Sequence, residues 1–255
     1  MLRKSYIIHT PEEIARIRVA AAAAAQAREK IASMAEPGMT TRELDMLAGA
    51  VIRDLGGTPT FLGYGGFLAN ICISLNDEVI HGIASDNRVI QKGDVLSVDV
   101  GVTLNGAIGD TAKTIVVGEE TASADIKRLI DGTRLSLEAG IQAAKCGNCI
   151  QDISKAVEKV GLSHKLGIVR EYVGHGCGIR LHEPPEVPNF STRSRGEKLL
   201  PGMVLCIEPM MNLGTHRVFV ERDNWTVRTA DGKKSAHFEH MVLITEGQTE
   251  VLTKW

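Results

Sequence analysis

One stretch of the sequence occurs twice, as GDVLSVDVG at residues 93–101 and as GMVLCIEPM at residues 202–210. The two copies are 109 residues apart, and this offset pairs Asp99 with Glu208. Apolar residues alternate with other residues, which is typical of a β-strand with one buried face. In the first copy the apolar residues are expected on one face, and Ser97 and Asp99 on the other. Each copy would then direct a carboxylate into a shared space.

The segments that precede these strands share the same offset. PGMTTRELDMLAGAVIRDLGG predicts a helix from residue 37, and CGNCIQDISKAVEKVGLS repeats its apolar pattern from residue 146. Two separate segments with one offset indicate a duplicated unit. The sequence therefore predicts a single domain over residues 1–255, with pseudo-symmetric halves at about 10–118 and 119–248. Each half should consist of helices followed by strands.

A further helix is predicted to begin after Thr10. The residues Thr10–Glu13 place a cap, a proline and a glutamate in the order of a capping box, and the helix should end before Pro37. Alanine is the best helix former and has a very small side chain. The run Ala20–Ala25 therefore indicates close packing of this helix against a neighbour.

The composition is that of an average globular chain. Hydrophobic residues make up 44%, charged residues 24%, and the net charge is −2, so neither nucleic acid nor an anionic membrane is expected as a partner. The N-terminal apolar stretch is too short for a signal peptide, and no segment is long enough to span a bilayer. Five cysteines in such a chain predict free thiols and a cytoplasmic location. Cys146 and Cys149 form a C-x-x-C without a second ligand pair, which favours structural cysteines over a redox or zinc site.

Four acidic residues lie in apolar, strand-like segments. Asp99 and Asp110 flank a predicted hairpin with Asn105-Gly106 as its turn, and Glu208 and Glu239 lie in later strands. Each one taken alone could be a surface or turn acid. Together with a histidine they would supply oxygen and nitrogen ligands for a pair of divalent cations, whose charge would offset the cost of burying four carboxylates.

Two histidines seven residues apart lie in GHGCGIRLHEPP, residues 174–185. The glycine spacing does not match a dinucleotide-binding loop, and two prolines follow where a helix would have to continue. The alternative is that the glycines let the backbone pass close to another group while His175 and His182 point towards it. His237 and His240 flank Glu239 and are expected near the same site.

Six segments taken together resemble the type I methionine aminopeptidases over nearly the whole chain. They are HGI at 81–83, VDVG at 98–101, GDTAK at 109–113, GHGCGIRLHEPP at 174–185, CIEPMM at 206–211 and FEHMV at 238–242. The resemblance implies the pita-bread fold, an α+β architecture with a curved antiparallel sheet flanked by helices and a pseudo-two-fold internal repeat. It also implies a cytosolic metallo-aminopeptidase that removes the initiator methionine from nascent chains whose second residue is small.

The same resemblance implies roles for the acidic residues. Asp99 would chelate one metal ion, Asp110 and Glu239 would bridge both ions, and His175 with Glu208 would complete the other. The two divalent ions could be Mn, Fe, Co or Zn, because oxygen and imidazole ligands are compatible with each. A hydroxide that bridges them would attack the peptide carbonyl.

Three side chains would assist the reaction. Glu208 is implied as the proton shuttle, His182 as the group that hydrogen-bonds the scissile carbonyl or its oxyanion, and His81 as a group that positions the nucleophile. Asn76 and Ser235 resemble positions that help to hold a monovalent cation.

The resemblance also implies an apolar pocket for one methionine side chain. Its residues would be Phe61, Tyr64, Phe67, Cys72, Leu181 and Trp225, with His81 and His182 beside them. Around residues 61–72 a hairpin turn in the core is the alternative explanation of the glycine-rich sequence. Phe61 stands where a cysteine is frequent and Leu181 where a phenylalanine is usual, so the first should narrow the pocket and the second widen it.

Two other functions stay open. A proline-specific aminopeptidase would share the fold and the metal ligands, and a non-catalytic adaptor for RNA or the ribosome would share the fold alone. Arg193, Arg195 and Lys198 could make a transient ribosome contact, although a solvated loop is the simpler explanation of such a charged run. A monomer is expected.

Overall fold

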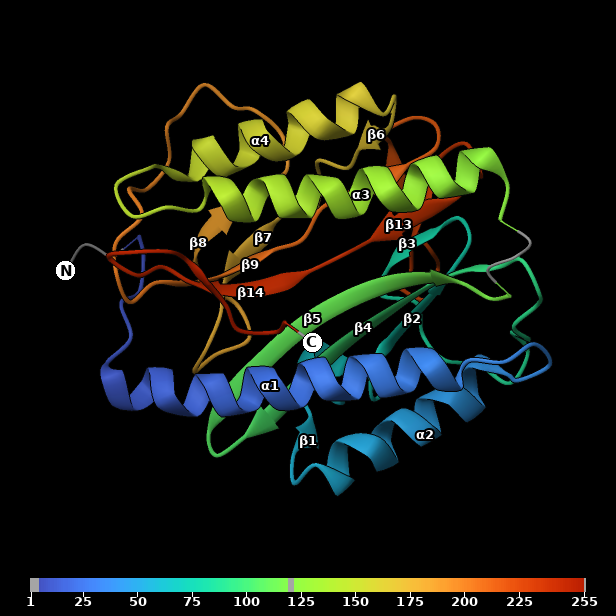
Figure 1. Cartoon of the computed structure of the whole chain (residues 1–255). Helices are drawn as coiled ribbons and strands as arrows, with labels where there is room; N and C mark the ends of the chain where they lie inside the picture. Colours follow the sequence, from blue (N-terminus) through green and yellow to red (C-terminus); the bar gives the residue numbers. More distant parts are fainter. Residues whose placement is uncertain (1–4, 119–121, 255) are drawn as a thin grey trace.

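The computed structural model describes residues 5–118 and 122–254, and its helices lie on opposite sides of the strands (Figure 1). In the first half, α1 (Pro11–Met34) and α2 (Thr41–Asp54) cover one side. In the second half, α3 (Ala124–Ala143) and α4 (Ile150–Ser163) cover the other. Within the described residues, no helix combines the length and apolar character needed to cross a bilayer.

Within residues 5–118 and 122–254 the strands form four small sheets, and every pair there is antiparallel. The first-half sheet contains β1 (Thr58–Pro59), β4 (Val95–Leu104), β2 (Cys72–Leu75) and β5 (Ala107–Val116). The largest second-half sheet has the order β15 (Glu250–Val251), β14 (His240–Leu243), β9 (Val204–Ile207), β7 (Gly174–Gly176), β8 (Glu183–Val187). The other two have the orders β13 (Ser235–His237), β10 (Met210–Asn212), β6 (Gly167–Ile168) and β11 (Val218–Val220), β12 (Val227–Thr229), β3 (Glu78–Ile80). One short 3₁₀ turn, η1, spans Tyr64–Gly66.

Hydrogen bonds from β5 join the two halves. The backbone N–H of Glu239 donates to the carbonyl of Ala112 at 3.0 Å, and the Thr111 hydroxyl donates to the carbonyl of Glu239 at 2.8 Å. One strand of the first half therefore lies beside the segment between β13 and β14. The predicted α+β fold with antiparallel strands between flanking helices is confirmed.

The internal repeat is visible in the backbone. Helices α2 and α4 begin 109 residues apart, as do strands β4 and β9. Gly38 and Gly147 both adopt positive φ, at 96° and 91°, and Gly93 and Gly202 do so at 89° and 88°. Glycine adopts this conformation without the steric cost of a Cβ atom. The duplicated sequence thus repeats its turns as well as its strands and helices.

The helix predicted from residue 37 begins later, at Thr41. Gly38 lies in a turn with left-handed backbone, and Thr40 is the N-cap. The Thr40 hydroxyl accepts from the N–H of Glu43, whose carboxylate accepts in return from the N–H of Thr40. This capping box satisfies backbone donors that a helix start leaves unpaired, and so it places the first turn after Thr40. The capping box predicted for α1 at Thr10 is confirmed.

The alanine run of α1 packs directly against β5. Five of the six residues Ala20–Ala25 are buried. A Cβ atom on Gly109 of β5 would lie 2.3 Å from the carbonyl oxygen of Ala20, closer than atoms can approach. Only small side chains on the helix and a glycine on the strand permit this distance. The close packing predicted from the alanines is therefore confirmed, and it supports the strand that carries Asp110.

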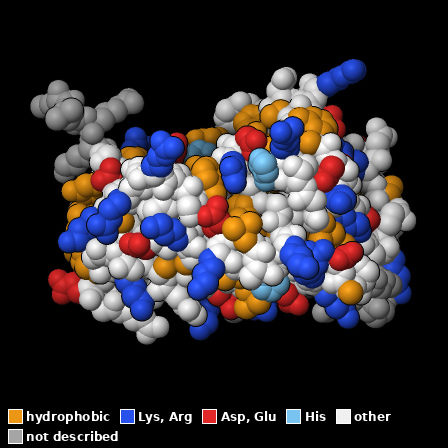
Figure 2. Space-filling model, turned by 90° about the horizontal axis from the view of Figure 1, so that it is seen from above, with side chains coloured by type: hydrophobic (Ala, Val, Ile, Leu, Met, Phe, Trp, Pro, Cys, Tyr) orange, Lys and Arg blue, Asp and Glu red, His pale blue; other side chains and the backbone are white. Residues whose placement is uncertain are grey.

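The face over α3 and α4 carries side chains of both charges. Lys and Arg are interspersed with Asp and Glu across this surface (Figure 2).

Candidate active site

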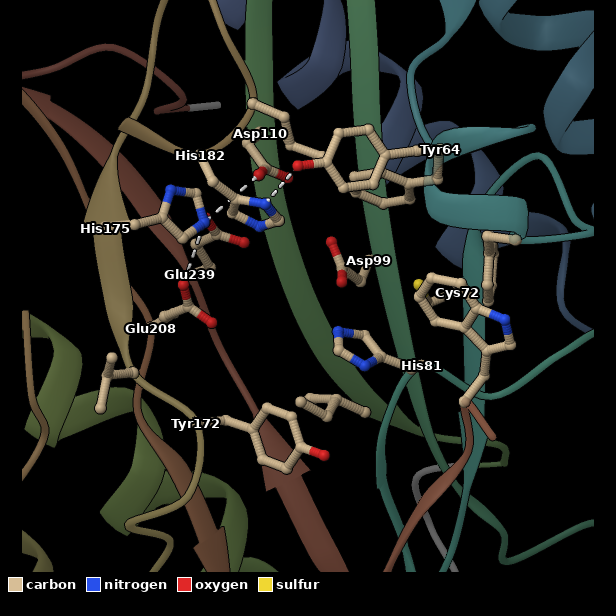
Figure 3. Close-up of a pocket in the computed structure, with 16 residues that line it drawn as sticks. Tyr64, Cys72, His81, Asp99, Asp110, Tyr172, His175, His182, Glu208 and Glu239 are labelled. Carbon is tan, nitrogen blue, oxygen red and sulfur yellow. Dashed lines mark hydrogen bonds and ion pairs between the residues drawn. The ribbon is translucent and has the colours of Figure 1, made fainter. Parts of the chain in front are cut away.

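A cavity of about 240 Å³ lies between the strands of the two halves (Figure 3). Asp99 on β4 and Asp110 on β5 face it from the first half, while His175 on β7, Glu208 after β9 and Glu239 before β14 face it from the second. Every residue that the sequence analysis assigns to the divalent metal site, to catalysis or to substrate binding lines this cavity. They are Phe61, Tyr64, Phe67, Cys72, His81, Asp99, Asp110, His175, Leu181, His182, Glu208, Trp225 and Glu239.

The β4–β5 hairpin places its two aspartates on one face. Asn105 and Gly106 form the turn with φ of 53° and 70°, which fits a tight hairpin turn. Asp99 pairs with Ala112 and Asp110 pairs with Gly101, so the aspartates are diagonal neighbours across the two strands. The apolar residues of β4 point away into the core, which confirms the predicted alternation.

The acidic side chains lie within a few ångströms of two histidines. His175 Nε2 is 3.4 Å from Glu208 Oε1 and 4.0 Å from Asp110 Oδ2 (Figure 3). His237 Nε2 is 3.6 Å from Glu208 Oε2. His175 is oriented by a 2.9 Å contact from its Nδ1 to the carbonyl of Gly176. His240 points elsewhere, because its Nδ1 contacts the Thr253 hydroxyl at 2.8 Å. The expectation that both histidines beside Glu239 lie near the site is therefore wrong for His240.

Burial and mutual repulsion shift the pKa of every carboxyl in this cluster upwards. Burial, and then the nearby Glu208, raise the pKa of Asp99 to about 8. Burial, with repulsion from neighbouring carboxylates, raises the pKa of Asp110, Glu208 and Glu239 well above the ordinary values. Burial lowers the pKa of His175 to about 4. The site therefore disfavours four bare negative charges and holds a neutral imidazole, which is the state in which histidine binds metals.

The donor set fits divalent metal ions. Ligand atoms of Asp110, His175, Cys206 and Glu239 all lie within 4.8 Å of one another. Asp99 Oδ1, Asp110 Oδ1 and Glu239 Oε1 are buried and have no hydrogen-bond partner among the described residues. Buried carboxylate oxygens without partners are costly unless a cation satisfies them. The arrangement of oxygen and imidazole donors around one small space is what a metal site requires.

Cys206 in this cluster was not predicted. It is fully buried, and burial followed by its contact with Cys177 raises the pKa of its thiol well above the ordinary value. A signal was present, because the 109-residue offset aligns Cys206 with Ser97, and both lie two residues before a predicted metal ligand on the same strand face.

His182 lies at the exposed rim of the cavity. Its Nδ1 is 2.8 Å from the Tyr64 hydroxyl, and its ring is 4.4 Å from the His175 ring, measured between centroids. His81 lies deeper and contacts the Trp225 and Tyr172 rings at 6.2 and 5.7 Å. Burial, and then the charge of His182, lower the pKa of His81 to about 4. His81 is therefore neutral near pH 7.

An apolar pocket adjoins the carboxylates. Phe61, Phe67, Cys72 and Leu181 are buried there, and the Phe67 and Trp225 rings meet edge to face at 5.2 Å. The sequence analysis did not single out three further lining residues. Val173 lies two residues before His175, a spacing that places side chains on one face of an extended segment, so this signal could have found it. Ile80 directly precedes His81, and alternation gives no such signal there. Tyr172 carried no comparable signal. The lining residues missed are Ile80, Tyr172 and Val173.

The proposed monovalent-cation residues lie side by side outside this cavity. The N–H of Ser235 donates to the carbonyl of Asn76 at 2.8 Å. The Asn76 side chain contacts Asp94 and the N–H of Val95, and the Ser235 hydroxyl donates to the carbonyl of Met211. A monovalent cation at this place stays a prediction.

Comparison with known proteins places the chain in a family. Residues 15–246 match the model of metallopeptidase family M24. Methionine aminopeptidase 1 of Bacillus subtilis is 44% identical over 248 residues, which cover 97% of this chain and 99% of that protein. The methionine aminopeptidase of Escherichia coli is 37% identical over 247 residues, covering 96% and 93% of the two chains.

Solved structures agree with this assignment. The crystal structure of methionine aminopeptidase from Thermotoga maritima matches with a TM-score of 0.94 and 40% identity, covering 98% of this chain and 100% of that one. A prolidase from Pyrococcus furiosus matches with a TM-score of 0.79 and 24% identity over 66% of its length, which is a likeness of fold. The chain therefore belongs to metallopeptidase family M24, whose members are metal-dependent peptidases, and over nearly its whole length it is similar to methionine aminopeptidases.

Proposed function

We propose that this protein is a methionine aminopeptidase that removes the N-terminal methionine from peptides whose second residue is small. The observation that carries the proposal is the single cavity in which a buried carboxylate cluster meets an apolar pocket. The pocket can take one unbranched apolar side chain, and the cluster can hold the metal ions that hydrolyse the adjoining peptide bond. The names of its relatives support the same substrate.

The ligands in this proposal are Asp99, Asp110, His175, Glu208 and Glu239, which would hold two divalent cations. Divalent cations held there would supply Lewis-acid activation of the peptide carbonyl and of the attacking water. Four carboxylates balance the charge of two such ions, which explains why the cluster can be buried. The number of ions and their identity among Mn, Fe, Co and Zn are part of the proposal.

Three residues would move or hold protons. Glu208 would take up a proton from the attacking water and pass it to the leaving amine. The Tyr64 hydroxyl can donate to His182 Nδ1, and this leaves the proton of a neutral imidazole on Nε2. His182 Nε2 would then donate to the carbonyl oxygen as negative charge develops on it. His81, which is also neutral, would position the attacking water.

The apolar pocket would select the first residue. Phe61, Phe67, Cys72, Leu181 and Trp225 exclude water from a space that suits a thioether side chain. Such packing discriminates between substrates whose first side chains differ by one methylene group by about 1–3 kcal/mol. The opposite effects predicted for Phe61 and Leu181 on pocket width stay predictions.

The setting of the enzyme is also proposed. We place it in the cytoplasm as a monomer with one catalytic domain, consistent with its five free cysteines and with a hydrophobic cluster that contains residues of both halves. Arg193, Arg195 and Lys198 are exposed, and a transient ribosome contact through them stays a prediction.

The test is hydrolysis by metal-stripped protein to which Mn²⁺ or Co²⁺ is added stepwise. We expect methionine release from Met-Ala-Ser that depends on metal, with little release of leucine from Leu-Ala-Ser or Leu-Pro-Ala. Cleavage of Leu-Pro-Ala in preference to the others would instead identify a proline-specific enzyme. No cleavage of any peptide under either metal would contradict the proposal and favour the adaptor function.

A further inference from the structure

A second cavity, a groove of about 800 Å³, adjoins the active site at His182. One wall is the N-terminal segment Ser5–Ile8, and the other is formed by Arg180, His182 and Pro184. His182 lines both this groove and the active-site cavity. The two spaces therefore meet at the residue to which we assign the contact with the scissile carbonyl.

The two walls of the groove meet at a buried contact between a histidine and a glutamate. His9, which follows the first wall, has its Nε2 3.1 Å from Glu183 Oε2 in the second wall, and both side chains are buried. His9 Nδ1 also lies 3.6 Å from Glu13. The other Glu183 oxygen accepts from the N–H groups of Ile179 and Arg180 at 3.1 and 2.8 Å. The groove is thus held in shape before any ligand enters, which reduces the entropic cost of binding.

The groove offers one unpaired cation and an apolar wall. Arg180 is exposed, and its guanidinium makes no hydrogen bond or ion pair with any residue in 5–118 or 122–254. Across the groove, Ile8 exposes 49% of its surface. An extended peptide with acidic side chains matches this combination, because arginine binds carboxylates with two parallel hydrogen bonds.

The substrate supplies such a peptide. If the first residue occupies the apolar pocket, the rest of the chain must leave over the rim, where Tyr64 is 44% exposed and bonded to His182. Resting on the function proposed above, we infer that the groove binds the part of the substrate that follows its second residue. In this site Arg180 favours peptides with acidic residues.

The experiment compares peptides that differ only beyond the third residue. Met-Ala-Ser-Asp-Asp-Asp, Met-Ala-Ser-Gln-Gln-Gln, Met-Ala-Ser-Lys-Lys-Lys and Met-Ala-Ser are hydrolysed by wild type, Arg180→Gln, Arg180→Glu and the control Arg193→Glu. At low ionic strength wild type should prefer the acidic to the basic hexapeptide by about two- to five-fold in kcat/KM, as one exposed ion pair provides. The preference should vanish in Arg180→Gln and at 1 M salt, reverse in Arg180→Glu and persist in Arg193→Glu. All variants should hydrolyse C-terminally amidated Met-Ala-Ser equally, because this peptide brings no carboxylate into the groove.

The outcomes separate this inference from the proposed function. If wild type releases methionine from Met-Ala-Ser but Arg180→Glu keeps the wild-type ratio between hexapeptides, the downstream peptide lies elsewhere and the groove assignment is overturned. Equal hydrolysis of all hexapeptides by wild type would overturn it as well. If wild type loaded with metal releases no methionine from Met-Ala-Ser, the proposed function itself fails. Thermal unfolding of each variant checks that charge reversal at this exposed position leaves the fold intact.

Discussion

The metal-free protein should become less stable as the pH rises from 6.5 to 8, and Asp99 should cause a measurable part of this loss. Its pKa is about 8 in the folded state, against an ordinary value of 3.8. A raised pKa means that the folded state binds the proton more tightly than the unfolded state. The free energy of unfolding therefore falls as the pH rises towards 8.

The magnitude follows from linkage. Between pH 6.5 and 8, Asp99 alone lowers the free energy of unfolding by about 2 kcal/mol, since one pH unit per proton corresponds to about 1.4 kcal/mol. In a chain of this size that shifts the melting temperature by roughly 4–8 °C. Below pH 6.5 the histidines oppose this trend, because burial lowers the pKa of His175 to about 4 and that of His237 to about 3. Their contribution is lost as the pH falls. Between pH 6.5 and 8 each buried histidine still opposes the carboxyl effect by about 0.4 kcal/mol, so the contribution of Asp99 is isolated by comparison with Asp99→Asn.

The assay is urea unfolding and thermal unfolding in the presence of a chelator, at intervals from pH 6.5 to 8. Wild type is compared with Asp99→Asn, which cannot ionise, and with Asp86→Asn at an exposed loop position. The free energy of unfolding should fall less steeply with pH in Asp99→Asn than in wild type. In Asp86→Asn it should fall as steeply as in wild type. Addition of Mn²⁺ should restore stability most strongly at pH 8, where ligands lose their protons most easily. Identical slopes for wild type and Asp99→Asn would refute the reasoning.

Three further changes have defined outcomes. Glu239→Ala should abolish both activity and metal uptake, measured by elemental analysis, with an unchanged circular dichroism spectrum; near-normal turnover would rule out the metal pair. Tyr64→Phe removes the hydroxyl that contacts His182 Nδ1 at 2.8 Å. It should lower kcat for Met-Ala-Ser by about five-fold with little change in KM, because one hydrogen bond contributes about 1 kcal/mol to the transition state. A five-fold rise in KM with unchanged kcat would instead indicate a role in substrate binding. Gly109→Ala forces a Cβ against α1 and should cost roughly 1–3 kcal/mol of unfolding free energy, whereas Gly247→Ala, with no atom within 4 Å, should cost much less.

Much of the fold was predictable because its signals are local. The capping box at Thr10, the Asn105-Gly106 turn and the alternation of β4 each depend on residues within one or two turns of chain. The 109-residue repeat extended this information to the second half. The start of α2 was placed too early, since the apolar pattern does not show that Gly38 adopts a left-handed turn.

The site residues were named from motifs, and the structure brings those assigned to the divalent metal site, catalysis and substrate binding to one cavity. Motifs identify side chains by their neighbours along the chain, so they could not separate His237, which approaches Glu208, from His240, which turns to Thr253. The face of the sheet on which each side chain lies decides between the two. For His240 this face is set by the pairing of β14 with β9.

The sequence by itself determined helices α1, α2 and α4, the hairpin, the repeat and the chemical types of the candidate ligands. Only the tertiary structure decided that Cys206 joins the carboxylate cluster, that Tyr64 contacts His182, and that His9 meets Glu183 beside the second groove. The physical reason is the range of each interaction. Capping, turns and strand alternation act between residues close in sequence, whereas these contacts join segments that only the packing of the two halves brings together.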